Sequence, residues 1–162
     1  MTIDPIQQEY EELWKEYGLL AIPKRTIQAA SALSELVFVG EINEAKEEDL
    51  LGKIIEAMGY NRSQVPIVSL LNPSDIDKSL SMIKEQISIR KPKVVVALGS
   101  TATILLSGLD SDLSQMRGKW MKLHWDKKIN LIATYPPSYL LINPSAKKTV
   151  WEDMKLAKKK LS

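Results

Sequence analysis

The chain has 162 residues, 44% hydrophobic and 26% charged, and its 22 Lys and Arg against 20 Asp and Glu leave a net charge of +2. This length and balance are typical of one globular domain with its own core, and they exclude an indiscriminate polyanion binder. The lack of cysteine excludes a disulfide framework, a cysteine nucleophile, a zinc–thiolate site and a Cys-ligated iron–sulfur cluster. No apolar run approaches the ~20 residues of a membrane span, and the acidic N-terminus is unlike a secretory signal. We therefore expect a cytoplasmic protein without a membrane partner, and neither a metal nor another cofactor.

Residues 1–34 are expected to form an N-terminal helix and arm ahead of the main domain, residues 35–162. Apolar side chains recur at helical spacing over residues 4–18, where Asp4 and Pro5 resemble an N-cap and first turn and Gly18 ends the helix. Residues 19–34 are less regular and predict a linker that packs loosely or serves a partner.

Strand and helix patterns then alternate along the chain. Strands are predicted at residues 36–39, 65–71 and 94–98, and residues 119–124 and 129–133 are expected to pair across a turn. Helices are predicted at residues 46–58, from Ser74 or Asp75 onward, at 101–107, and after a cap at Ser145. The first of these helices is expected to turn its apolar side chains inward: Leu50, Leu51, Ile54, Ile55 and Met58.

This alternation predicts an α/β fold, a single three-layer αβα domain with a mostly parallel central sheet. In such sheets, functional residues gather outside the carboxyl ends of the strands. Here those ends lead into Glu41, Asn72, Ser100 and the loop that begins at Thr134.

Four segments carry a resemblance to a known family. The loop Thr134-Tyr135-Pro136-Pro137-Ser138-Tyr139-Leu140-Leu141-Ile142-Asn143-Pro144 resembles the second signature loop of the uracil-DNA glycosylase superfamily. Residues 91–102, the element Arg117-Gly118-Lys119-Trp120 and the later residues Val150-Trp151-Glu152-Asp153 are similar to the bacterial and archaeal (family 4-like) members. The resemblance implies a uracil-DNA glycosylase-like fold.

The chain departs from that family where its chemistry resides. The family's loop reads His-Pro-Ser, with an imidazole facing the uracil carbonyl, whereas Pro136 has neither a side-chain donor nor a backbone N–H. The first signature, Gly-Glu-Ala-Pro-Gly, is followed only as far as Glu41, and the segment with the phenylalanine that stacks on uracil is missing. Because base flipping needs a pocket that stacks the base, these losses indicate degenerate chemistry.

The resemblance still singles out candidate site residues. Glu41, at a strand's carboxyl end, is the candidate general base. Asn72 is either the residue that reads the edge of uracil or a turn residue at a helix entry. The remaining candidates for DNA contact or a degenerate pocket are Ser100, Arg117, Tyr135, Pro136, Ser138 and Tyr139. Ser100 and Thr101 also fit a helix N-cap, and His124, the single histidine, fits a strand or hairpin residue better than a catalytic one.

A second resemblance concerns the psi subunit of the bacterial DNA polymerase III clamp-loader assembly, a reduced glycosylase-like fold without an active site. Residues 10–19 and Pro23-Lys24-Arg25 resemble the psi N-terminal arm, and Asn143-Pro144-Ser145-Ala146-Lys147 resembles its closing pattern. This resemblance implies that the chain binds clamp-loader subunits and the chi subunit. The arm would contact its partner through Tyr10, Leu13, Trp14, Tyr17, Lys24 and Arg25.

Three hypotheses follow. The first is a non-catalytic, psi-like accessory subunit in DNA replication. The alternative is a divergent uracil-DNA glycosylase in base excision repair, with Glu41 activating water and residues 135–141 wedging the minor groove. The third is a DNA-binding pseudoenzyme. The lysines of the last helix fit either a solvated face or a basic surface for nucleic acid or an acidic protein.

Overall fold

The computed structural model describes residues 34–70 and 76–162. The predicted N-terminal helix and arm lie outside the described residues, and so do Asn72 and the predicted partner-binding residues Tyr10, Leu13, Trp14, Tyr17, Lys24 and Arg25. The described elements are, in chain order, β1 (Leu36–Gly40), α3 (Ala45–Ala57), β2 (Ile67–Ser69), α4 (Ile76–Arg90), β3 (Val94–Leu98), α5 (Ser100–Ser107), α6 (Leu113–Met116), β4 (Trp120–Lys122), β5 (Asn130–Thr134), α7 (Pro137–Ile142), η2 (Pro144–Ala146) and α8 (Lys147–Leu161).

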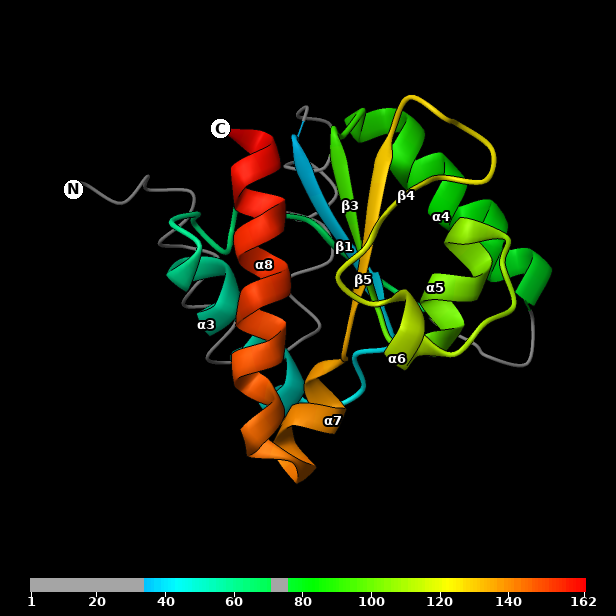
Figure 1. Ribbon diagram of the computed structural model, residues 1–162. Coiled ribbons are helices and arrows are strands. Elements are labelled where there is room, and N and C mark those ends of the chain that lie inside the picture. The colour runs from blue at the N-terminus through cyan, green and yellow to red at the C-terminus, as the bar shows by residue number, and fades with distance from the viewer. Residues whose placement is uncertain (1–33, 71–75) are drawn as a thin grey trace.

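A five-stranded sheet in the order β2-β1-β3-β5-β4 forms the centre of the domain (Figure 1). The pairs β1–β2, β1–β3 and β3–β5 are parallel, and β4 lies antiparallel to β5. The mostly parallel sheet and the hairpin expected from residues 119–124 and 129–133 are therefore confirmed. Strand β2 is shorter than the predicted 65–71.

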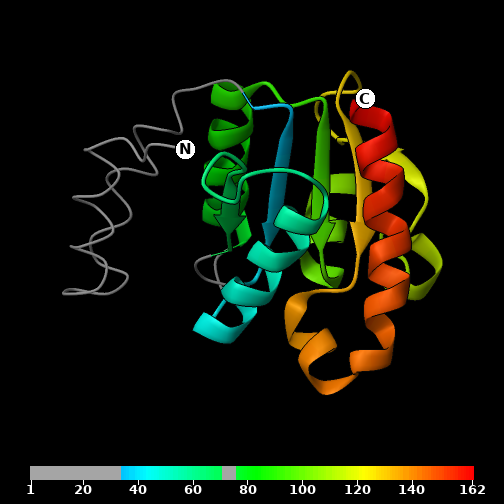
Figure 2. The same ribbon diagram turned by 90° about the vertical axis from the view of Figure 1, so that its left-hand side faces the viewer.

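Helices cover both faces of the sheet, which confirms the three-layer prediction. β1 and β3 are buried along their whole length, as their uninterrupted apolar runs predict. Because successive side chains point to opposite faces, Val37 and Val95 pack in the core beneath α4 and α5, whereas Phe38 and Val96 pack beneath α3 and α8. The views in Figures 1 and 2 show α3, α7 and α8 on one side of the sheet and α4, α5 and α6 on the other.

Two helix boundaries differ from the prediction for local reasons. α3 begins at Ala45 because Glu44 and Glu47 form a capping box, in which Glu47 Oε2 accepts a hydrogen bond from Glu44 N at 2.8 Å. The last helix is capped by Ala146 and not by Ser145, because residues Pro144–Ala146 first form a 3₁₀ turn.

Not all the side chains expected to face inward from α3 are buried. Leu51, Ile55 and Met58 belong to the core, whereas Leu50 and Ile54 are only half-buried. None of the helices that the structure describes is long and apolar enough to cross a membrane.

Candidate active site

The register of the sheet aligns the carboxyl ends of the central strands. Gly40 of β1 lies beside Leu98 of β3, and Leu98 lies beside Thr134 of β5. The next residues, Glu41, Gly99 and Tyr135, therefore leave the sheet at the same edge. Since neighbouring strands lie about 4.8 Å apart, the backbones at Glu41 and Tyr135 are roughly 10 Å apart, on either side of Gly99. The two predicted halves of the site thus meet at one edge.

The loop that follows Glu41 is short. Leu70 N donates a hydrogen bond to Gly40 O at 3.0 Å, and Ser69 Oγ donates to Ile42 O at 3.5 Å, so the loop lies against the end of β2. α3 then begins at Ala45. The passage from β1 to α3 therefore takes only residues 41–44, none of which is aromatic.

Gly40 allows β1 and β3 to approach closely just before Glu41. A Cβ atom on Gly40 would lie 2.6 Å from Leu98 Cβ and 2.8 Å from Leu98 O. The carbonyl belongs to a central strand that cannot move aside at low cost. The glycine therefore determines how near Glu41 lies to the end of β3.

Gly99 and Pro136 form the middle of the edge. Gly99 has φ of 94°, which favours glycine, and its N–H donates to Thr134 O at 3.1 Å. A Cβ atom on Gly99 would lie 3.5 Å from Pro136 Cγ, an ordinary contact distance. The pyrrolidine ring of Pro136 thus lies over the end of β3.

α7 presents the rest of the signature loop to solvent. Its Leu140 is fully buried and anchors the helix, while Tyr139, Leu141 and Ile142 are 40%, 42% and 80% exposed. The ring of Tyr139 stacks on that of half-buried Tyr135, with centroids 4.6 Å apart and planes at 25°. Ser138 is exposed. Ile142 was not among the sequence-predicted residues, although helical spacing from buried Leu140 would have placed it outward.

Arg117 is engaged by another side chain. Its Nη2 and Nε donate to Asp153 Oδ1 and Oδ2 at 2.6 and 3.1 Å, and Thr134 Oγ1 donates to Asp153 Oδ2 at 2.7 Å. Asp153 is 1% exposed. The hydrogen bond to Asp153 raises the pKa of Arg117, so the guanidinium stays charged. The pair fixes α8 to the end of β5, and Arg117, which we expected in a pocket or on DNA, here has this structural partner.

Gly118 completes the same junction. Its N–H donates to Ala133 O at 3.0 Å, and with φ of 71° it brings the backbone so close that a Cβ atom would lie 2.7 Å from Asp153 Oδ1. The sequence resemblance included both the Arg-Gly element and the segment with Asp153, but it did not predict that Arg117 and Asp153 bind each other.

Ser100 and His124 lie at opposite ends of α5. Gly99 is the N-cap, so Ser100 is the first helical residue and not the cap that the sequence suggested. Ser100 is exposed at the edge shared with Pro136. The His124 ring packs against Gly108, the C-cap of α5. The backbone N–H of His124 donates a hydrogen bond to Leu106 O at 2.8 Å. An eight-residue helix is about 12 Å long, which separates His124 from the candidate site.

Within residues 34–70 and 76–162, no cluster of three or more His, Asp or Glu side chains could hold a metal ion. What the described edge does offer is one half-buried carboxylate, two exposed serine hydroxyls and a protruding apolar helix. These can orient water, donate hydrogen bonds and contact a nucleic acid, respectively.

Comparison with known proteins agrees with this geometry. Residues 27–155 match the family model of the uracil DNA glycosylase superfamily. Among curated relatives, the type-4 uracil-DNA glycosylase of Thermotoga maritima is 30% identical over 77% of this chain and 77% of its own length. The enzymes of the same name from Sulfurisphaera tokodaii and Archaeoglobus fulgidus are 30% and 26% identical, over 75% of this chain and 68% and 74% of their own lengths.

These matches bear unequally on the hypotheses drawn from the sequence. They confirm the resemblance to the glycosylase superfamily and its fold. They favour the glycosylase alternative over the psi-like reading that we placed first, and the expectation of a non-catalytic protein gains no support from them.

Proposed function

Because the chain belongs to the uracil-DNA glycosylase superfamily, we propose that it is a divergent uracil-DNA glycosylase that hydrolyses the bond between uracil and deoxyribose in DNA. The proposal is supported by relatives named type-4 uracil-DNA glycosylase at 26–30% identity. In this reaction water replaces the base at the sugar carbon, and the bonding electron pair leaves with uracil.

The observation that carries the proposal is the alignment of Gly40, Leu98 and Thr134 across the sheet. It supports a site in which Glu41 lies on one side of the strand edge and the signature loop on the other. The half-buried Glu41 carboxylate would orient the attacking water and accept its proton.

The leaving uracil carries negative charge, and Pro136 has no group that can bind it. Loss of one such donor typically costs about 10²–10³ in rate, so we expect a slow enzyme. The exposed hydroxyls of Ser100, next to Gly99, and of Ser138, two residues after Pro136, lie close along the chain to this part of the edge. We propose that they supply part of the missing interaction.

The exposed side chains of α7 fit contact with DNA. Tyr139, Leu141 and Ile142 form an apolar projection whose base is held by buried Leu140. Apolar side chains of this kind can enter the minor groove and unstack neighbouring bases, which assists extrusion of a nucleotide.

The test is release of uracil from a single-stranded oligonucleotide by the full chain. Glu41→Gln should reduce release by about 10²-fold or more, because it removes the general base. Glu56→Gln, which changes an exposed carboxylate on α3, serves as the matched control and should leave the rate unchanged. No release by the wild-type chain at high protein concentration would refute the proposal.

A non-catalytic, psi-like subunit is the second candidate, because Pro136 has no side-chain donor that could bind a leaving base. This candidate predicts that the chain co-purifies with clamp-loader subunits and chi, and that replacing Trp14 and Tyr17 with alanine abolishes co-purification. Equal recovery of wild-type and variant complexes would contradict the role of the arm.

A further inference from the structure

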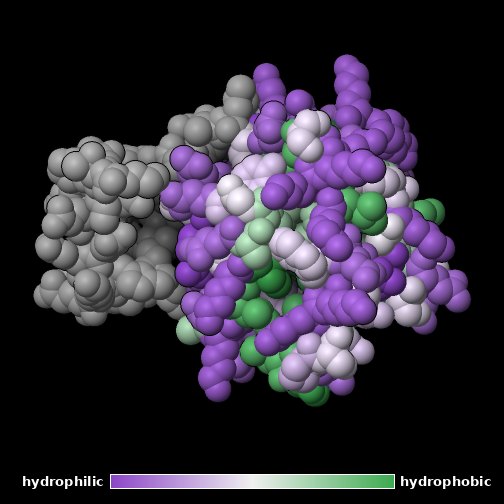
Figure 3. All heavy atoms as spheres, turned by 60° about the vertical axis from the view of Figure 1, so that its left-hand side comes forward, coloured by the Kyte–Doolittle hydropathy of each residue, from purple (hydrophilic) through white to green (hydrophobic). Residues whose placement is uncertain are grey.

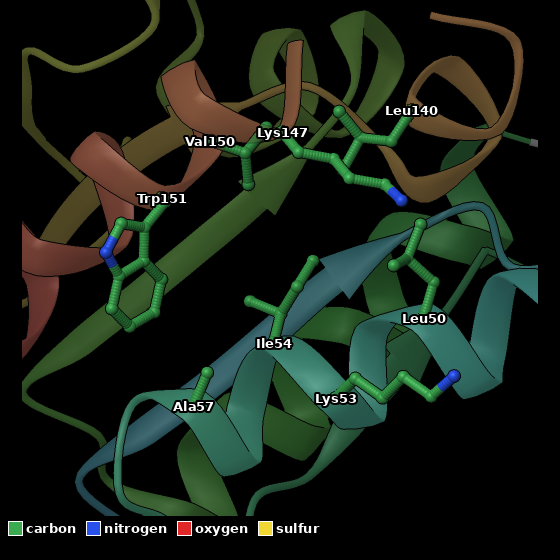
Figure 4. Close-up of a pocket in the computed structure, with 8 residues that line it drawn as sticks. All are labelled: Leu50, Lys53, Ile54, Ala57, Leu140, Lys147, Val150 and Trp151. Atoms are coloured by element: carbon green, nitrogen blue, oxygen red, sulfur yellow. The ribbon is translucent and has the colours of Figure 1, made fainter. Parts of the chain in front are cut away.

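A groove runs between α3 and α8. It has a volume of about 220 Å³, and its lining includes Leu140 of α7 but neither Glu41 nor Pro136. Figure 4 shows Leu50 and Ile54 entering it from α3, and Val150 and Trp151 entering it from α8. The floor is therefore apolar, with room for a large aromatic side chain.

The groove arises because two helix surfaces face each other without closing. Leu50 and Ile54 are one helical turn apart on α3, and Lys147 and Trp151 are one turn apart on α8. Leu50 and Ile54 are only half-buried, and Trp151 is 36% exposed. On the face of the molecule in Figure 3, hydrophobic side chains gather in a hollow surrounded by hydrophilic ones. Such a surface is typical of two helices on which a third helix can pack.

The rim of the groove is basic. Lys53 and Lys147 line it, and Lys158 lies at the end of α3, where its Nζ would be 3.7 Å from a Cβ atom on Gly59. Among the acidic residues of α3, Asp49 is bound by Lys53 at 3.2 Å and by Arg62 at 3.8 Å. An acidic occupant would therefore be favoured over a basic one.

One segment of the chain has the complementary properties. Over residues 4–18, the predicted helix has one apolar face, made of Ile6, Tyr10, Leu13, Trp14 and Tyr17. The same segment has a net charge of −4, because Lys15 is its one basic residue. Its five carboxylates are those of Asp4, Glu9, Glu11, Glu12 and Glu16. We propose that residues 4–18 dock as an amphipathic helix in the groove between α3 and α8, with an aromatic side chain in the apolar floor.

The connection is long enough for this docking. Seventeen peptide bonds separate Tyr17 from Ser34, and an extended chain of that length spans up to about 55 Å. This exceeds the diameter of a domain whose radius of gyration is about 14 Å. A tether of this kind also gives a local concentration in the millimolar range, so a weak contact suffices.

The lack of cysteine makes the proposal directly testable in the full chain. Two variants place one cysteine on the acidic segment and one on the rim: Glu16→Cys with Lys53→Cys, and Glu16→Cys with Lys147→Cys. A short bis-maleimide should join each pair within one molecule, detected by mass spectrometry. The control, Glu16→Cys with Lys84→Cys, places the second cysteine on α4, across the sheet, and should crosslink about tenfold less.

A charge reversal tests the basic rim without disturbing the core. In the Glu16→Cys, Lys53→Cys background, Lys147→Glu should lower the crosslinking yield about two- to fivefold, because it replaces an attractive charge by a repulsive one. Lys148→Glu makes the same change at the next position, which is also exposed but does not line the groove, and should have no effect.

Three outcomes would overturn the proposal. Equal crosslinking to Lys84→Cys would mean that the segment has no preferred position. Crosslinks found only between molecules would mean that a second copy provides the occupant. Equal effects of Lys147→Glu and Lys148→Glu would mean that the groove does not receive the acidic face.

Discussion

The Asp153 carboxylate binds the Arg117 guanidinium through two hydrogen bonds, at 2.6 Å from Nη2 and 3.1 Å from Nε. Asp153 also accepts a hydrogen bond from Thr134, the last residue of β5. This carboxylate therefore connects α8, the loop before β4 and the residue that immediately precedes the signature loop. The position of Tyr135 and Pro136 therefore depends on the hydrogen bonds that Asp153 makes with Arg117 and Thr134.

Replacing Asp153 should be costly. Asp153→Asn removes the buried charge that binds Arg117, whose side chain is 26% exposed, and the loss of hydrogen bonds to a charged group typically lowers the free energy of unfolding by about 1.5–3 kcal/mol. Urea unfolding followed by circular dichroism would measure the loss. Glu152→Gln alters the exposed neighbouring carboxylate and should stay within about 0.5 kcal/mol of the wild type. A loss below 1 kcal/mol for Asp153→Asn would contradict the anchoring role.

Gly40 should not tolerate a side chain. In Gly40→Ala the new Cβ meets Leu98 Cβ and its backbone carbonyl at 2.6 and 2.8 Å, and overpacking of this kind costs about 1–3 kcal/mol. Gly52→Ala on α3 is the matched control, because the three atoms nearest to its Cβ belong to the Arg62 guanidinium, on a flexible side chain that is 41% exposed. Alanine also suits a helix interior better than glycine, so Gly52→Ala should be neutral or stabilising. Equal destabilisation by both variants would be inconsistent with a specific contact between β1 and β3.

Restoring a donor at residue 136 should restore catalysis. If the remaining site is intact, Pro136→His should raise the rate of uracil release by about 10²–10³-fold, measured on the same single-stranded oligonucleotide. Pro136→Leu removes the proline without adding a donor and should show no gain. Equal rates for both variants would mean that the limiting defect lies elsewhere, such as the shortened loop after Glu41.

The exposed side chains of α7 should affect the rate of uracil release from duplex DNA but not from single-stranded DNA. Ile142→Ser should reduce uracil release from a duplex about tenfold while leaving release from a single strand unchanged, because a single strand needs no unstacking wedge. Its thermal stability should not change, since Ile142 is 80% exposed. Ile89→Ser, an equivalent change at the end of α4, is the control. A parallel loss on both substrates would argue against a wedge.

The sequence predicted the strands more accurately than the site. β1 and β3 are continuous apolar runs because both their faces are covered, so their burial could be read directly from composition. The outward direction of Leu141 and Ile142 was also within reach, from helical spacing around Leu140. Leu50 and Ile54 pack against the core as their spacing predicted, but they are only half-buried. The sequence of one helix does not show how closely the neighbouring helix approaches it.

By itself, the amino-acid sequence determined the alternating αβ architecture, the family resemblance and the loss of a donor at Pro136, because these depend on residue types and their order. Only the tertiary structure decided that Arg117 binds Asp153, that Gly40 contacts Leu98 and that a groove remains between α3 and α8. These features join residues far apart in the chain. They depend on the distances between packed elements, and those distances follow from how all side chains fill the core together.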